Sequence, residues 1–217
     1  MKHLVIILLL TVQAKAKEVR IAVLDSGLTS TPGVNLCQPI IDLTNTTPDS
    51  EIHHHGDNVT HIIADGLTNY CIIEIKIWSM SSKISENLLS KAIYESIRLN
   101  ADIINISGGG DGVDAKEEAA IRYAEFRHVI VVSAAGNDGE NLTNNCYYYP
   151  ACYPSVVAIG NLHVSGNYGA GVDYYMRGVN VTAGGVTLTG TSQAAAMFTH
   201  KLAKKMSKVI SMIADNK

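Results

Sequence analysis

The chain has no excess of positive charge and no long hydrophobic run. Its 17 Lys and Arg residues are outnumbered by 20 Asp and Glu residues, giving a formal net charge of −3 with both signs mixed along the sequence. This pattern lacks the basic patch typical of nucleic-acid-binding proteins, so no nucleic-acid partner is expected. The apolar run at residues 4–12 is too short for a transmembrane helix, which needs about 20 residues.

The chain also lacks the motifs of several other protein classes. The glycine-rich residues 108–112 have neither the lysine nor the spacing of a phosphate-binding loop. No Gly-x-Ser-x-Gly motif followed by Asp and His is present, which excludes an α/β-hydrolase of the esterase or lipase type. The chain has one cluster of histidines, formed by His53, His54, His55 and His61. No second group of ligands follows at the spacing of a zinc site, so we expect neither a metal nor a cofactor.

The first sixteen residues predict an export signal. Lys2 precedes the apolar run, and Ala14-Lys15-Ala16 has the small-x-small form of a signal-peptidase site; a buried N-terminal strand is the alternative. We therefore expect a signal peptide at residues 1–16 and a secreted mature protein with no membrane contact. Residues 17–217 contain no repeat or linker, and 47% of the chain is apolar, which predicts one domain with its own core.

Short apolar runs alternate with helical patterns in the rest of the chain. Strands are expected at residues 19–24, 39–43, 71–77, 102–106, 129–133 and 156–159. Helices are expected at residues 59–64, at residues 86–99 with Ser85 as N-cap, and from a capping box of Asp114 and Glu117 to about residue 126. This alternation predicts a three-layer α/β fold, with a mostly parallel β-sheet and helices on both faces.

Three polar residues fall at one edge of the predicted sheet. Asp25 ends the first strand, whereas His55 and Ser192 each open a helix. In such a sheet the carboxyl ends of the strands and the N-termini of the helices meet at the edge where ligands bind. Each residue alone is typical of a turn or a helix cap. Together they can act as nucleophile, general base and the acid that orients the base.

A fourth residue follows another buried strand. Residues 131–139 read Val-Val-Ser-Ala-Ala-Gly-Asn-Asp-Gly, so three small residues precede Asn137. Small residues can form a shallow pocket floor, and the asparagine amide can donate a hydrogen bond to an oxyanion.

These segments resemble the subtilisin-like serine proteases, or subtilases. The matching pieces occur in the order of the family across nearly the whole mature chain: residues 22–27 (Ala-Val-Leu-Asp-Ser-Gly), 55–56 (His-Gly), 105–109 (Asn-Ile-Ser-Gly-Gly), 133–139, 149–160 and 190–192 (Gly-Thr-Ser). The resemblance implies a secreted serine endopeptidase that hydrolyses polypeptides through an Asp25–His55–Ser192 triad and an acyl-enzyme intermediate. We expect it to act as a monomer.

The resemblance also implies roles for residues around the triad. Asn137 and the backbone N–H of Ser192 would form the oxyanion hole. Tyr148 would lie at the bottom of the primary pocket, where its ring leaves space only for small substrate side chains. An extended substrate would pair with a strand formed by Ser107, Gly108 and Gly109. One wall of the pocket beside the scissile bond would consist of Ala134, Ala135 and Gly136.

The sequence departs from the family pattern in three ways. After His55-Gly56 it continues with Asp57-Asn58, and the Asp57 carboxylate predicts either a raised pKa of His55 or a preference for a basic substrate residue. Asp25 follows the signal sequence without the propeptide of most secreted subtilases, and only 25 residues follow Ser192. A catalytically inactive, peptide-binding subtilase-like domain is therefore the second hypothesis.

The four cysteines predict two disulfides in an oxidising compartment. Cys146 and Cys152 flank five residues and would close a small ring beside the primary pocket. Cys37 and Cys71 adjoin two candidate strands that the family resemblance implies are neighbours, so a second bridge would join them. Four reduced thiols are the alternative for an uncleaved, cytoplasmic chain.

Overall fold

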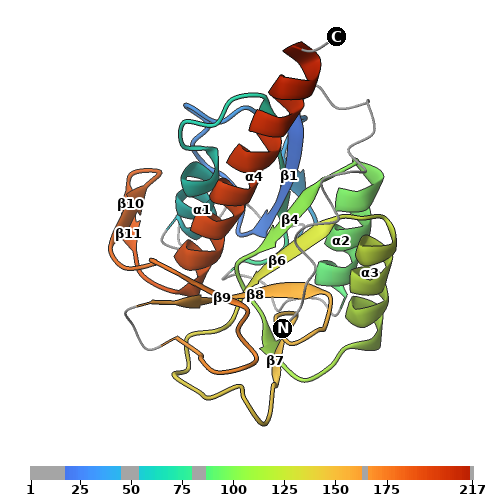
Figure 1. The fold of residues 1–217 in the computed structure, drawn as a ribbon, viewed down its shortest axis with the longest axis vertical. Helices are drawn as coiled ribbons and strands as arrows, with labels where there is room; N and C mark the ends of the chain where they lie inside the picture. Colours follow the sequence, from blue (N-terminus) through green and yellow to red (C-terminus); the bar gives the residue numbers. More distant parts are fainter. Residues whose placement is uncertain (1–17, 45–53, 80–86, 163–165, 216–217) are drawn as a thin grey trace.

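The computed structural model describes residues 18–44, 54–79, 87–162 and 166–215, so the expected signal peptide lies outside the described residues. Its centre is a sheet in the order β2-β3-β1-β4-β6-β8-β9, in which all neighbouring strands are parallel (Figure 1). The strands are β1 (Val19–Asp25), β2 (Ile41–Asp42), β3 (Tyr70–Lys76), β4 (Ile103–Ile106), β6 (Ile130–Ala134), β8 (Val156–Asn161) and β9 (Tyr174–Met176).

Helices cover both faces of this sheet. The helices α1 (His55–Ala64) and α4 (Thr191–Asp215) pack on one face, and α2 (Leu88–Arg98) and α3 (Ala115–Phe126) pack on the other (Figure 1). Because side chains alternate along a strand, consecutive residues of β1 divide between two cores. Ile21 and Val23 face the core under α1 and α4, whereas Ala22 and Leu24 face the core under α2 and α3. The structure confirms the expected three-layer α/β fold.

The remaining strands are short and were not expected from the sequence. An antiparallel hairpin of β10 (Val181–Ala183) and β11 (Val186–Leu188) lies beside α1, and β5 (Gly110–Asp111) pairs with β7 (Tyr148–Tyr149). Two- and three-residue strands carry too few residues for an alternating pattern, so only their tertiary pairing reveals them.

The start of α1 agrees with the sequence, and the start of α2 differs from it. The helix α1 begins at His55, the residue expected to open it, and includes the apolar pattern expected at residues 59–64. The helix α2 begins at Leu88 and is preceded by Asn87 with a φ of 82°. The expected N-cap Ser85 lies outside the described residues.

The N-terminus of α3 matches only half of the expected capping box. The Asp114 carboxylate accepts hydrogen bonds from the N–H groups of Lys116 and Glu117, both at 2.8 Å. The N–H of Asp114 donates to the Tyr153 hydroxyl at 3.2 Å, so it is not available to the Glu117 side chain. Tyr153 therefore takes the place of the second half of the box.

Residues 107–109 do not form the expected strand. The strand β4 ends at Ile106, which is the last residue in register with Leu24 of β1 and Ser133 of β6. Beyond that point the neighbouring strands no longer pair with this segment, and pairing resumes only at β5. The three residues connect the sheet to β5.

The structure contains both expected disulfides. Cys37 is bonded to Cys71 and Cys146 to Cys152, and no free cysteine occurs among the described residues. The first bridge fastens the segment before β2 to β3, the strand that β2 pairs with. None of the described helices is long and apolar enough to cross a membrane.

Candidate active site

Asp25 and His55 form a hydrogen-bonded pair at the carboxyl edge of the sheet. Asp25 is the last residue of β1 and is fully buried. Its Oδ1 lies 2.8 Å from Nδ1 of His55 and also accepts the N–H of Ser26 at 2.7 Å. With Nδ1 carrying the proton, the second ring nitrogen of His55 is left as a base.

The turn after β1 holds the start of α1 against this aspartate. The Ser26 hydroxyl accepts the N–H of Gly56 at 3.0 Å. A β-carbon on Gly56 would lie 2.0 Å from the carbonyl oxygen of Gly27, so only glycine allows this close approach. The approach fixes His55, the first residue of α1, beside Asp25.

The electrostatics of His55 come from Asp25. Burial lowers the pKa of His55, but the charge of Asp25 and its hydrogen bond raise it by more, so the net pKa is raised. A raised pKa makes the imidazole a stronger proton acceptor.

Asp57 does not have either of the effects expected from the sequence. Its carboxylate is buried and accepts hydrogen bonds from the Thr29 hydroxyl at 2.6 Å and from the N–H groups of Thr29 and Ser30. It also lies 3.0 Å from Nδ1 of His54. Burial raises the pKa of Asp57, and these hydrogen bonds lower it by more. The carboxylate is thus directed at the loop after β1 and is closed to a substrate side chain.

Ser192 lies at the same edge but is not hydrogen-bonded to the histidine. It is the second residue of α4, and its hydroxyl donates to the carbonyl oxygen of Ser107 at 2.9 Å. The Ser107 side chain is in turn held by Nδ2 of Asn105 at 2.9 Å. The structure therefore joins Asp25 to His55, and joins Ser192 to the segment after β4.

Asn137 is held next to the start of α4 by one end of its side chain. Its Oδ1 accepts the N–H of Thr191 at 2.9 Å and the Thr191 hydroxyl at 3.1 Å. A β-carbon on Gly190 would lie 3.3 Å from Nδ2 of Asn137, so the amide nitrogen borders the turn before Ser192. With the oxygen occupied, Nδ2 is the end that can donate to a ligand.

Sequence reasoning missed the residue that shapes the Asn137 loop. The buried side chain of Asn167 donates to the carbonyl oxygen of Ala135 at 2.8 Å and accepts the N–H groups of Asp138 and Glu140 at 3.1 and 3.0 Å. These bonds enclose Asn137 from both sides. No local signal identifies Asn167, because its partners lie 27–32 residues away in sequence.

Asn58 is a second missed residue, and it links the two helices of the site. Its Nδ2 lies 3.1–3.2 Å from the carbonyl oxygens of Val181, Ala183 and Val186 in the β10–β11 hairpin. Its Oδ1 accepts Nε2 of Gln193 at 3.1 Å. Both side chains are buried, and Gln193 directly follows Ser192. The sequence signal for Asn58 was its position directly after His55-Gly56-Asp57, where the chain departs from the family pattern.

Tyr148 lies between the two segments expected to bind substrate. A β-carbon on Gly109 would lie 2.8 Å from Cε1 of the Tyr148 ring, and one on Gly136 would lie 3.0 Å from the other edge of the ring. The ring thus fills the space between residues 107–109 and residues 134–136.

This arrangement, an aspartate–histidine pair and a helix-opening serine on the carboxyl edge of a parallel three-layer sheet, is typical of serine proteases that are built on an α/β fold. Residues 16–215 match the model of the subtilase family, and the chain belongs to that family.

Curated relatives include bacterial subtilisins. Subtilisin Savinase of Lederbergia lenta is 29% identical over 197 residues, which cover 81% of this chain and 71% of Savinase. An alkaline protease of Shouchella clausii is also 29% identical over 81% of this chain, but the match spans only 50% of that protein. The chain thus spans about half the length of several of its relatives.

Similar solved structures agree on the fold. The S218A mutant of the protease domain of PatA has a TM-score of 0.77 and 24% identity, covering 92% of this chain and 84% of that one. The epidermin leader peptide processing serine protease of Staphylococcus aureus has a TM-score of 0.74 and 21% identity, covering 89% and 66%.

Proposed function

We propose that the chain is a secreted serine endopeptidase whose catalytic triad is Asp25, His55 and Ser192. The observation that carries this proposal is the 2.8 Å contact between Asp25 and His55 at the edge where Ser192 opens α4. Membership of the subtilase family supports the same reaction. The substrates would be polypeptides, and the products two shorter peptides.

The reaction would proceed by acyl transfer. A substrate N–H that binds the Ser107 carbonyl would displace the Ser192 hydroxyl, which would then donate to Nε2 of His55. The hydroxyl oxygen would attack the peptide carbonyl as His55 takes the proton, and Asp25 would stabilise the resulting imidazolium. His55 would return the proton to the leaving amine, and water would hydrolyse the acyl-enzyme by the reverse sequence.

Two donors would stabilise the negative oxygen of the tetrahedral intermediate. Nδ2 of Asn137 is one, since Oδ1 is held by Thr191. The other is the N–H of Ser192 in the first turn of α4, where the positive end of the helix dipole favours an anion.

The primary pocket would accept only a small side chain. The Tyr148 ring occupies the space between Gly109 and Gly136. Ala134 and Ala135 would line the same wall. Alanine or glycine before the scissile bond would therefore be preferred over a large residue.

Secretion is supported by the two disulfides and by the signal sequence proposed at residues 1–16. Disulfides persist in oxidising compartments and are rare in the cytosol. We propose that the domain of residues 17–217 acts as a monomer outside the cytoplasm.

The test uses a fluorescent fluorophosphonate, which phosphonylates an activated serine. We expect the wild-type chain to be labelled and to cleave casein, and Ser192→Ala to do neither while keeping the wild-type melting temperature. Ser211→Ala, on the same helix, serves as the control and should be labelled normally. An unlabelled, folded wild-type chain would overturn the proposal and favour the peptide-binding alternative.

A further inference from the structure

A buried carboxyl group outside the proposed triad lies against the helix that carries His55. Glu74 belongs to β3 and is in register with Val23 of β1. Its side chain is 1% exposed, and its Oε2 accepts a hydrogen bond from the hydroxyl of Thr60 on α1 at 2.8 Å. Thr60 is itself fully buried. This hydrogen bond joins the middle of β3 to α1 inside the core.

Glu74 and Asp25 are neighbours on the same face of the sheet. Side chains alternate along a strand, and Val23 faces the core under α1 and α4. Glu74, opposite Val23, and Asp25, two residues further along β1, therefore both face α1. With about 4.8 Å between strands and about 3.3 Å per residue, their α-carbons lie about 8 Å apart. The charge of Asp25 acts on Glu74 at this range.

Each of these two carboxyl groups has one bound oxygen and one oxygen without a partner. Oδ1 of Asp25 lies 2.8 Å from Nδ1 of His55 and also accepts the N–H of Ser26, and Oε2 of Glu74 accepts the Thr60 hydroxyl. Oδ2 of Asp25 and Oε1 of Glu74 are buried and have no hydrogen-bond partner among the described residues. Burying two incompletely bound negative charges side by side is costly. Since Asp25 must be charged to pair with His55, Glu74 is the group that keeps its proton.

The surroundings of Glu74 favour the neutral form. Burial and, second, repulsion from Asp25 raise the pKa of Glu74 well above its usual value. The hydrogen bond from Thr60 lowers this pKa, and the charge of Asp57 on α1 raises it further. The other titratable groups on this face of β3 and on α1 have partners of their own, which are Gly33 for Tyr70, Asp42 for Lys76 and Pro32 for His61.

We propose that Glu74 is a positioning residue for the Asp25–His55 pair and that it acts as a neutral carboxylic acid. Through Thr60 it holds α1 against β3, which fixes His55 beside Asp25. By keeping its proton it avoids a second buried negative charge next to Asp25. The inference rests on the proposed function, because the pair that Glu74 positions belongs to the proposed triad.

The protonation state is tested by the pH dependence of stability. The pKa of Glu74 is higher in the folded chain than its ordinary value of 4.5, so the folded state binds the extra proton. The wild-type chain therefore loses stability as the pH rises from 4.5 toward the folded pKa. Glu74→Gln stays neutral, and its melting temperature should rise relative to the wild type by about 3–5 °C per pH unit in this window. Difference infrared spectra of the two proteins at pH 7 should contain the C=O band of a neutral carboxylic acid.

The positioning role is tested by changing each end of the hydrogen bond between Thr60 and Glu74. Glu74→Met keeps the length and removes the acceptor, whereas Thr60→Val keeps the shape and removes the donor. Each should shift the proton NMR resonance of the His55 Nδ1–H group and lower kcat by about 10- to 100-fold with KM little changed, because a misplacement of about 1 Å can cost about 100-fold. The double variant should lose no more than either single variant. Glu74→Gln still accepts the Thr60 hydroxyl and should keep the wild-type resonance and kcat.

Asp102→Asn is the matched control. Asp102 is a partly buried acid whose pKa is raised by burial, and it lies directly before β4, at the opposite edge of the sheet from His55. Its replacement should also gain stability relative to the wild type as the pH rises. The His55 resonance and kcat should not change.

The melting, infrared and NMR measurements need no substrate, so they separate this inference from the proposed function. If no variant cleaves peptide but the His55 resonance responds as expected, the proposed activity fails and the assignment of Glu74 stands. A stability difference between Glu74→Gln and the wild type that does not change with pH would show that Glu74 is ionised. A Glu74→Met chain that keeps the wild-type His55 resonance would show that Glu74 does not position the pair. Either result overturns the inference.

Discussion

At the scale of single residues, the two ends of the Asn137 side chain have different partners. Thr191 binds the oxygen, which leaves the amide nitrogen for the substrate. Because Thr191 and Asn137 are 54 residues apart, the orientation of this amide depends on the packing of two elements.

Asn137→Leu keeps the side-chain volume and removes the donor. We expect kcat to fall by about 10²–10³, a magnitude that was measured in a subtilisin, with KM little changed because the oxyanion exists only in the transition state. Steady-state kinetics on an alanine-containing peptide gives both constants. Asn144→Leu, in the exposed loop nearby, is the control. A large rise in KM with normal turnover would contradict the assignment.

At the scale of elements, Asn58 joins three of them. It lies on α1, contacts three carbonyl groups of the β10–β11 hairpin and accepts a hydrogen bond from Gln193 of α4. The helices that carry His55 and Ser192 are thereby held in one geometry.

Asn58→Ala should therefore affect both stability and catalysis. We expect the free energy of unfolding to fall by about 1–3 kcal/mol, since buried carbonyl groups lose their donor. The turnover number kcat should fall as well, because α1 and α4 lose their link. Gln193→Leu removes only that link and should be less destabilising.

Denaturant titration and steady-state kinetics measure the two effects. Ser211→Ala, which removes an exposed hydrogen bond between α4 and Asn69, should change neither quantity. Wild-type stability and turnover in Asn58→Ala would show that the link has no positioning role.

At the scale of the whole molecule, the two disulfides close loops of very different length. Cys37 and Cys71 are 34 residues apart, whereas Cys146 and Cys152 are 6 apart. A longer loop loses more conformational entropy in the unfolded chain when it is closed.

Replacing Cys37 and Cys71 together by serine should lower the free energy of unfolding by about 3–4 kcal/mol in the entropy model. The matched change at Cys146 and Cys152 should cost less stability. Denaturant unfolding of both variants and the wild type tests the order. A larger loss for the short loop would show that local packing around Tyr148 outweighs chain entropy.

The sequence by itself determined the layered sheet and the residues at its edge. Asp25 ends an apolar strand and His55 precedes Gly56, and both signals are local, because strand ends and helix starts depend on residues within a few positions. Asn137 was identified by the buried strand and the small residues before it, and the family resemblance implied that the two strands beside Cys37 and Cys71 are neighbours.

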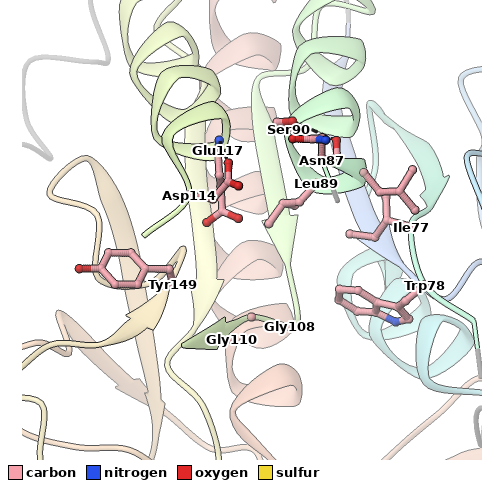
Figure 2. Close-up of a pocket in the computed structure, with 12 residues that line it drawn as sticks. Ile77, Trp78, Asn87, Leu89, Ser90, Gly108, Gly110, Asp114, Glu117 and Tyr149 are labelled. Carbon is pink, nitrogen blue, oxygen red and sulfur yellow. Dashed lines mark hydrogen bonds between the residues drawn. The ribbon is translucent and has the colours of Figure 1, made fainter. Parts of the chain in front are cut away.

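Tertiary structure alone decided which partners those residues have. The Ser192 hydroxyl binds a carbonyl 85 positions away, Gln193 binds Asn58 across 135 positions, and Asp57 turns toward Thr29 and away from the site. A pocket likewise forms where α2, α3 and residues 108–110 meet (Figure 2). These contacts depend on how the helices and strands pack against one another. The pattern of residues within each segment does not determine the distance between side chains that lie so far apart in the chain.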